Sequence, residues 1–169
     1  MPRLALTING QPQTLDAAAN TLLLDLLRER LHLTGSHRGC DTAQCGACTV
    51  RLNGKAVKAC NVLALQADGG EVQTVESLSQ STKTGKTWHP MQIAFSKHHG
   101  LQCGFCTPGM LMRACAMADE GVPAEDGAVR QGLAGNLCRC TGYEGIVGAV
   151  CEGMRLMRGE VVEATDAGL

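Results

Sequence analysis

Residues 39–60 read "GCDTAQCGACTVRLNGKAVKAC" and carry four of the ten cysteines in this 169-residue chain. Cys40, Cys45 and Cys48 follow a C-x4-C-x2-C spacing, and Cys60 ends the stretch. Glycines flank the loop that holds Cys40 and Cys45. Glycine lets backbone N–H groups turn inward toward an anionic centre, where they stabilise thiolates and bridging sulfides. The stretch therefore predicts a loop that gathers thiolates.

The second part of the same stretch predicts a β-hairpin. Asn53-Gly54 is the strongest short-range signal for a two-residue turn between two strands. Such a turn pairs residue 52 with 55, 50 with 57, and 48 with 59. Cys60 then lies beside Cys48 at the open end of the hairpin, where neighbouring strands are about 4.8 Å apart. The four thiols can therefore share one metal centre.

The spacing of this first group favours iron–sulfur chemistry. C-x4-C-x2-C followed by a distant cysteine is the spacing of plant-type [2Fe–2S] ferredoxins. A structural zinc site with four cysteine ligands and a disulfide pair are the competing interpretations. Zinc ligands usually come in pairs separated by two to four residues, so Cys45 and Cys48 fit zinc but the looped arrangement is unusual. His37 is interpreted as a solvated loop residue, because four cysteines already complete the site.

A second group of cysteines follows further along the chain. "LQCGFCTPGM" contains Cys103 and Cys106, and "NLCRCTGY" contains Cys138 and Cys140. Each pair precedes a predicted helix start, where free N–H groups and the positive end of the helix dipole favour anionic thiolates. A C-x-C pair is tighter than the usual zinc spacing, and no βαβ pattern of the thioredoxin type surrounds either pair. A second [2Fe–2S] cluster is the favoured interpretation.

The order of the predicted elements divides the chain into two domains. Two hairpins, a helix over residues 21–31 and a late strand predict a small α+β domain in residues 1–76. Residues 77–89 are polar and without period, which predicts a linker. Residues 90–159 contain four predicted helices, two of them over 91–98 and 124–133, and these form a small bundle with its cysteine loops between helices. The tail, residues 160–169, is expected to be disordered.

Apolar periodicity defines the helix faces. Leu23, Leu26, Leu27 and Leu31 share one face of the first helix. In the C-terminal half, one predicted helix has an apolar face made of Leu111, Ala114, Cys115 and Ala118. The last predicted helix has an apolar face made of Val147, Val150, Cys151 and Met154. Cys115 and Cys151 are interpreted as core residues, since a buried free cysteine behaves as a small hydrophobe.

Composition and charge exclude several classes of function. The net charge is −1, so the charge balance does not point to nucleic acid or to an anionic membrane. The N-terminal residues are not expected to act as a secretory signal, and no apolar stretch approaches the roughly 18 residues that span a bilayer. A cytoplasmic protein is expected, and in that compartment clustered cysteines bind metal or do redox work more often than they form disulfides.

Three stretches in this order, "GCDTAQCGACTV", "GLQCGFCTPGM" and "GNLCRCTGY", closely resemble the small iron–sulfur subunits of bacterial molybdenum hydroxylases, in the xanthine oxidase/aldehyde oxidase family. The resemblance covers residues 4–157. It is strongest to the stand-alone small subunits of aerobic carbon monoxide dehydrogenases and N-heterocycle dehydrogenases. It implies an α+β protein in which an N-terminal β-grasp ferredoxin-like domain precedes a C-terminal four-helix bundle domain of approximate two-fold symmetry.

The resemblance also implies a role for individual residues. Metal ligands of an outer [2Fe–2S] cluster, nearer a flavin subunit, are Cys40, Cys45, Cys48 and Cys60. Ligands of an inner [2Fe–2S] cluster, nearer the molybdenum cofactor, are Cys103, Cys106, Cys138 and Cys140. Gln102 matches the family glutamine that hydrogen-bonds the molybdopterin, and the competing interpretation is a polar loop residue. No catalytic residue is expected in this chain.

The implied function is electron transfer within an oxidoreductase complex. Electrons would pass from molybdopterin, expected as the cytosine dinucleotide, through two clusters to FAD. The expected partners are a large molybdopterin-binding subunit and a medium FAD-binding subunit, in a heterotrimer or a dimer of heterotrimers, without nucleic acid. The large subunit would bind the substrate, so this sequence does not identify it. The substrates left open are carbon monoxide, a purine or methylxanthine, nicotinate, quinoline and aldehydes. The competing functions are a free-standing two-cluster ferredoxin and a zinc-stabilised interaction protein.

Overall fold

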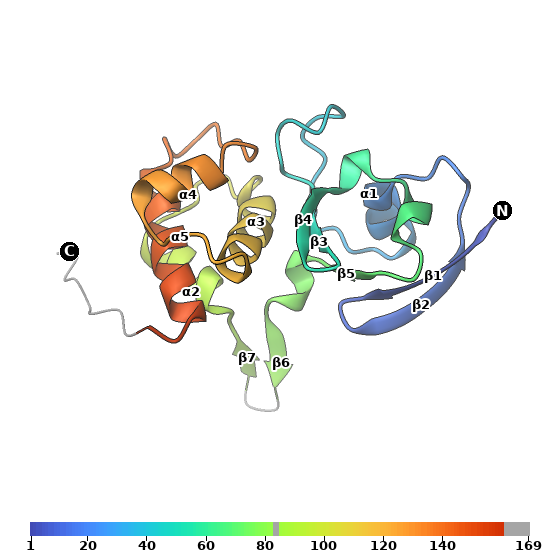
Figure 1. Ribbon diagram of the computed structural model, residues 1–169, viewed down its shortest axis with the longest axis horizontal. Coiled ribbons are helices and arrows are strands. Elements are labelled where there is room, and N and C mark those ends of the chain that lie inside the picture. The colour runs from blue at the N-terminus through green and yellow to red at the C-terminus, as the bar shows by residue number, and fades with distance from the viewer. Residues whose placement is uncertain (83–84, 161–169) are drawn as a thin grey trace.

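The structure, a computed structural model, describes residues 1–82 and 85–160 and has an α+β architecture, as predicted (Figure 1). The N-terminal half is built on a mixed five-stranded sheet and the C-terminal half on four helices. Figure 1 shows the two halves side by side, with the strands β6 (Gln80–Thr82) and β7 (Gly85–Thr87) below them. None of the helices in the described part of the chain is long and apolar enough to cross a membrane.

The sheet has the spatial order β2-β1-β5-β3-β4. Its strands are β1 (Arg3–Ile8), β2 (Gln11–Asp16), β3 (Thr49–Leu52), β4 (Lys55–Lys58) and β5 (Glu71–Gln73). β5 pairs parallel with β1, and the other neighbours pair antiparallel. Along β1 every second residue is buried, because successive side chains of a strand point to opposite faces of the sheet. One face of the sheet therefore carries the core of the N-terminal half.

The predicted register of the β3–β4 hairpin is confirmed. The paired residues are Thr49 and Lys58, Val50 and Val57, Arg51 and Ala56, and Leu52 and Lys55. The turn residues Asn53 and Gly54 have φ values of +51° and +80°, and positive φ at both positions matches the twist of a hairpin. At the open end the N–H of Ala59 donates to the carbonyl of Cys48 at 3.3 Å. This bond places Cys60 next to Cys48.

The leucine-rich helix covers the sheet, but it is shorter than the predicted 21–31. α1 (Leu23–Asp25) continues directly into a π-helical segment, η1 (Leu26–Arg30). The N–H of Leu31 donates to the carbonyl of Leu26 at 3.1 Å, which widens the last turn and leaves Leu31 only partly buried. The fully buried leucines of this segment are Leu23, Leu24, Leu26 and Leu27.

The C-terminal half contains the four predicted helical segments. They are α2 (Pro90–Lys97), α3 (Thr107–Asp119), α4 (Asp126–Gly132) and α5 (Glu144–Met157). α5 packs against each of the other three, around a core of alanines, methionines and β-branched residues. At Gly153 a Cβ would lie 2.4 Å from Sδ of Met91, so glycine lets α2 lie this close to α5. Cys115 is buried in this core and Cys151 packs against it.

The segment predicted as a linker, residues 77–89, contains an antiparallel hairpin of β6 and β7. Its strands consist of Gln, Ser, Thr, Gly and Lys, so they lack the apolar alternation that indicates a strand. Residues 83–84 and 161–169 lie outside the described residues. The predicted disorder of the tail 160–169 therefore stays a prediction for all of its residues but Glu160, whose N–H bonds to the carbonyl of Arg155.

Candidate metal centres

The loop between η1 and β3, together with the turn after β4, brings the first cysteine group together. Cys40 and Cys45 lie in the loop, and the N–H of Cys45 is 3.5 Å from Sγ of Cys40. Cys48 directly precedes β3, and Cys60 lies in the 3₁₀ turn η2 (Ala59–Asn61). Both Cys48 and Cys60 are buried. The group therefore has an outer pair of thiols in the loop and an inner pair on the hairpin.

The thiols of the first group differ in pKa. The sulfur of Cys40 is at the surface, and hydrogen bonds from the N–H of Cys45 and from Thr42 lower its pKa to about 6. Burial, with a hydrogen bond shared with the thiol of Cys60, raises the pKa of Cys48 to about 11. Burial also raises the pKa of Cys45. A metal centre would hold such buried thiols deprotonated, because its positive charge replaces the lost hydration.

The second cysteine group lies in two loops at one end of the C-terminal helices. The Sγ atoms of Cys103 and Cys140 are 3.5 Å apart. Burial, with a hydrogen bond shared with Cys138, raises the pKa of Cys106 to about 12. Burial acts to raise the pKa of Cys138 too, but the hydroxyl of Thr141, 3.2 Å from its sulfur, and nearby N–H groups outweigh burial and lower that pKa. Cys106 directly precedes α3, as predicted, so the free N–H groups of that helix start lie at this group.

In both groups the thiols come as two pairs. The interacting pairs are Cys40 with Cys45, Cys48 with Cys60, Cys103 with Cys140, and Cys106 with Cys138. Within residues 1–82 and 85–160, no three Cys, His, Asp or Glu side chains converge on a point suited to a single metal ion. A [2Fe–2S] cluster takes two protein ligands on each of its two irons. Two thiol pairs, with N–H groups directed at sulfur, fit that donor set.

A cavity of about 250 Å³ lies between the two loops, lined by Cys45 of the first group and by all four cysteines of the second group. At its edge the N–H of Leu137 donates to the carbonyl of Cys45 at 2.8 Å. The ring of His37 stacks on Phe105 with centroids 4.6 Å apart, and its Nδ1 lies 2.7 Å from the carbonyl oxygen of Phe105. The interpretation of His37 as a solvated loop residue was therefore incomplete, because His37 connects the two halves.

Asn136 joins the same two loops, and sequence reasoning missed it. Its side chain is buried, and its amide reaches the carbonyls of Gly46 and Gly109, each at 3.1 Å, and the hydroxyl of Thr49 at 3.2 Å. A Cβ at Gly109 would lie 2.2 Å from the carbonyl oxygen of Gly46, so this backbone contact requires glycine. An asparagine just before a cysteine loop was the available signal, but its burial depends on the contact between the halves.

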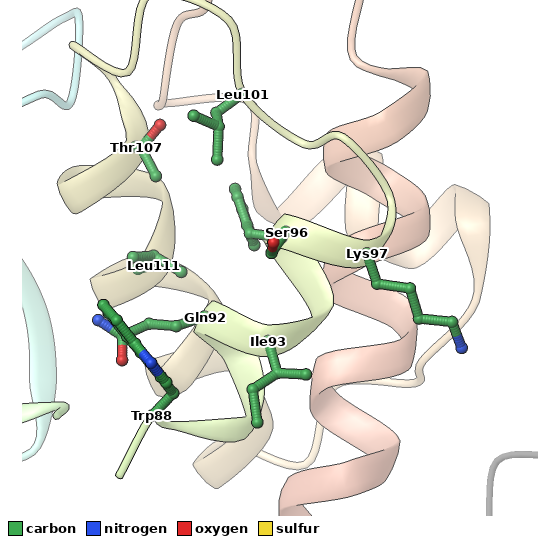
Figure 2. A pocket seen from close by; sticks show the side chains of 9 residues that line it. Trp88, Gln92, Ile93, Ser96, Lys97, Leu101, Thr107 and Leu111 are labelled. Carbon is green, nitrogen blue, oxygen red and sulfur yellow. The ribbon is translucent and has the colours of Figure 1, made fainter. Parts of the chain in front are cut away.

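An apolar groove of about 510 Å³ lies beside the second group, between α2 and the start of α3. Figure 2 shows side chains of α2 along one side of the groove and side chains of α3 along the other, with Leu101 at one end. The apolar side chains Trp88, Ile93 and Leu101 line it and are 52%, 51% and 41% exposed. The groove is therefore an exposed apolar surface of the kind that marks an interaction site.

Gln102, the predicted molybdopterin contact, lies between this groove and the second cysteine group. Its neighbour Leu101 lines the groove, and its other neighbour is Cys103. The side chain of Gln102 is exposed. Oγ1 of Thr107, which also lines the groove, is buried without a hydrogen-bond partner among the described residues. The contact of Gln102 with molybdopterin stays a prediction.

Comparisons with known proteins match both halves of the chain to iron–sulfur families. Residues 6–79 match the family described as "2Fe-2S iron-sulfur cluster binding domain", and residues 74–151 match "[2Fe-2S] binding domain". The 6-hydroxypseudooxynicotine dehydrogenase complex subunit beta of Paenarthrobacter nicotinovorans is 46% identical over 151 residues, which cover 89% of this chain and 92% of that protein. Caffeine dehydrogenase subunit gamma of Pseudomonas sp. (strain CBB1) is 44% identical over 150 residues, which cover 87% of each.

A solved structure agrees with these matches. Quinoline 2-oxidoreductase from Pseudomonas putida 86 contains a chain with a TM-score of 0.85 and 42% identity, and the match covers 95% of this chain and 98% of that one. The whole length of the fold is thus shared, and both iron–sulfur domains are present. The chain belongs to the family of small iron–sulfur subunits of molybdenum hydroxylases.

Proposed function

We propose that this chain relays electrons from molybdopterin in a large subunit to FAD in a medium subunit of a molybdenum hydroxylase. Two [2Fe–2S] clusters, when bound, supply two one-electron carriers in series. The residues of this chain hold the carriers at fixed positions and limit their contact with water. None of these residues acts on the substrate, which is the role expected of an oxidoreductase subunit without bond chemistry of its own.

The proposal assigns one cluster to each half. The outer cluster lies in residues 1–76 and has as ligands Cys40, Cys45, Cys48 and Cys60. The inner cluster lies in residues 90–159, taken as a four-helix bundle, and has as ligands Cys103, Cys106, Cys138 and Cys140. The arrangement of both groups as two thiol pairs supports this assignment.

The observation that carries the proposal is the bonded connection between the two groups. Leu137 is the residue before Cys138, and its N–H bonds to the carbonyl of Cys45 at 2.8 Å. A route from the inner to the outer group therefore runs along covalent bonds and crosses one hydrogen bond. Electrons tunnel more readily through such a bonded route than through an equal gap in space. Two clusters joined in this way can work in series.

The exposed groove supports the proposed partners. The large subunit would cover the groove and bring molybdopterin to Gln102, since Gln102 lies between the groove and the inner group. The medium subunit, with FAD, would lie nearer the outer group. The names of two relatives, a "complex subunit beta" and a "subunit gamma", describe proteins that work in multi-subunit complexes. The proposed complex is a heterotrimer or a dimer of heterotrimers.

Cysteine substitutions in the purified complex test the ligand assignment. We expect Cys140→Ser to remove one EPR-active centre and Cys48→Ser to remove the other, because each belongs to a different group. The matched control is Cys151→Ser, which changes a partly buried cysteine outside both groups and should leave both signals. Loss of both signals in folded Cys140→Ser, or loss of either in the control, would contradict the assignment.

Copurification tests the proposed partners. A tagged chain should recover a molybdenum-containing subunit and a flavin-containing subunit in equal amounts. Ile93→Gln in the groove should lower recovery of the molybdenum subunit several-fold, whereas Leu63→Gln, at an exposed leucine of the N-terminal half, should not. A chain that carries both clusters and purifies alone would instead be a free-standing ferredoxin.

A further inference from the structure

Lys58 occupies an unusual position at the junction of the two halves. It is the last residue of β4 and pairs with Thr49, the residue after Cys48. Cys60 follows Lys58 by two positions. The side chain of Lys58 therefore starts one step along the hairpin from the end that carries Cys48 and Cys60, and it is partly buried.

The ammonium group of Lys58 is held on the side that faces the second group. Its Nζ donates a hydrogen bond to the carbonyl of Gly135, at the start of the segment that carries Cys138. A Cβ at Gly135 would lie 3.2 Å from Nζ, so the backbone and the ammonium are in close contact. The hydrogen bond fixes the positive charge where the segment that leads to Cys138 contacts the hairpin of the first group.

The charge of Lys58 is not neutralised by a carboxylate. Across the described residues, no Asp or Glu oxygen lies within ion-pair distance of its Nζ. Arg38, also near the first group, differs in this respect because it pairs with Asp25 and Asp41. The charge of Lys58 is thus left to act on the neighbouring sulfurs.

The electrostatics of Lys58 agree with this geometry. Burial lowers its pKa, and the negative thiolates of the first group act in the opposite direction. The thiolates that do so are Cys48, Cys45, Cys40 and Cys60. Negative charge on the first group therefore favours the charged form of Lys58.

We propose that the Lys58 ammonium raises the reduction potential of the outer cluster and so directs electrons to it from the inner cluster. This inference rests on the proposed function. Reduction adds one negative charge to a cluster, and a fixed cation beside it stabilises the reduced state more than the oxidised state. Lys58 is a positioning and charge-supplying residue, not a ligand.

Potentiometric EPR titration of the purified complex tests the proposal. The outer-cluster signal is identified as the one that Cys60→Ser removes. We expect Lys58→Gln and Lys58→Met to shift the midpoint potential of that signal to lower values and to shift the inner-cluster signal less. Lys58→Arg, which keeps the charge, should leave the potential close to the original. Lys55→Gln, at an exposed lysine of the same strand, removes the same charge away from the cysteines and should have no effect.

Three results would overturn the proposal. An unchanged outer-cluster potential in Lys58→Gln, with both signals present, would overturn it and leave the proposed function intact. If neither neutral variant retains the outer cluster while Lys58→Arg does, the charge holds the loop and does not set the potential. Absence of both EPR signals from the unaltered complex would overturn the proposed function and this inference together.

Discussion

The backbone N–H of Leu137 donates a 2.8 Å hydrogen bond to the carbonyl oxygen of Cys45, and this bond joins the two cysteine groups. Both residues lie in loops, so the bond persists only if further contacts hold the two loops in place. Asn136 and the contact between Gly46 and Gly109 provide that support.

Asn136→Ala should weaken the junction. The change removes three hydrogen bonds from one buried side chain, to the carbonyls of Gly46 and Gly109 and to the hydroxyl of Thr49, although the carbonyl of Gly46 keeps its two hydrogen bonds from Thr49. We expect the free energy of unfolding to fall by about 2–4 kcal/mol, because a buried hydrogen-bond network is lost together with the packing of its side chain. Urea denaturation of the full chain measures it. Asn20→Ala, at an exposed turn, should change stability by less than about 0.5 kcal/mol, and an equally small effect of Asn136→Ala would contradict the role given to Asn136.

Gly109→Ala should separate the backbones of α3 and the first cysteine loop. Its Cβ would lie 2.2 Å from the carbonyl oxygen of Gly46, and backbone cannot move aside as a flexible side chain can. We expect a loss of about 1–3 kcal/mol in a thermal unfolding experiment. Gly127→Ala is the matched control, because it lies in α4 with no atom within 4 Å of the new Cβ. That change should stabilise the chain by up to about 1 kcal/mol, and the same sign for both variants would refute the explanation.

Tyr143→Phe should affect the inner cluster alone. The hydroxyl of Tyr143 accepts the N–H of Cys138 at 2.8 Å and donates to the carbonyl of Asn136 at 3.5 Å. Without this hydroxyl the N–H of Cys138 loses its hydrogen-bond acceptor, and the loop that carries Cys138 is held less firmly. The inner-cluster EPR signal should therefore decay several-fold faster in air. The outer-cluster signal of the same sample is the control. Equal decay of the two signals would show that the hydroxyl does not protect the inner cluster specifically.

Glu152→Gln should make stability less sensitive to acid. Glu152 on α5 is mostly buried and bonds to Lys97 at 2.9 Å and to the ring of His98. Burial acts to raise its pKa, but these two partners outweigh burial and lower it. A lowered pKa in the folded state stabilises the protein above the unfolded value of about 4.3, and this stabilisation is lost as pH falls through the folded pKa.

The expected result is therefore a difference that depends on pH. The original chain should be more stable than Glu152→Gln at neutral pH by about 1–3 kcal/mol, and the two should converge below about pH 4. Denaturation curves at several pH values measure this. Glu29→Gln, at an exposed position, should show little difference at any pH. A difference for Glu152 that grows as the pH falls below about 4 would have the wrong sign.

Local patterns predicted much of the fold. The Asn53-Gly54 turn determined the register of its hairpin, because a two-residue loop leaves no freedom in strand pairing. The C-terminal helices followed from apolar spacing. The π-helical turn at Leu26–Arg30 and the hairpin of β6 and β7 did not. The π-helical turn lies within the leucine period of the predicted helix, and that period does not distinguish an α-helix from a wider turn. The strands β6 and β7 have no apolar alternation, so contacts with the rest of the chain define both features.

The cysteine groups were visible in the sequence because ligand spacing is a local property. The contacts that bind the groups to each other were not, because they join residues far apart in the chain. His37 and Phe105 are 68 positions apart, and Asn136 and Gly46 are 90 apart. Lys58 is similar, since its carbonyl partner, Gly135, belongs to the other half. Such residues carry no spacing signal, and only the folded chain reveals them.

Metal and sulfide analysis of the purified chain, combined with EPR after reduction, tests the central claim most directly. Two paired thiol groups in two iron–sulfur domains predict about four iron and about four acid-labile sulfide per chain, with two distinct EPR signals. Zinc in place of iron, with no labile sulfide and no EPR signal, would contradict the claim.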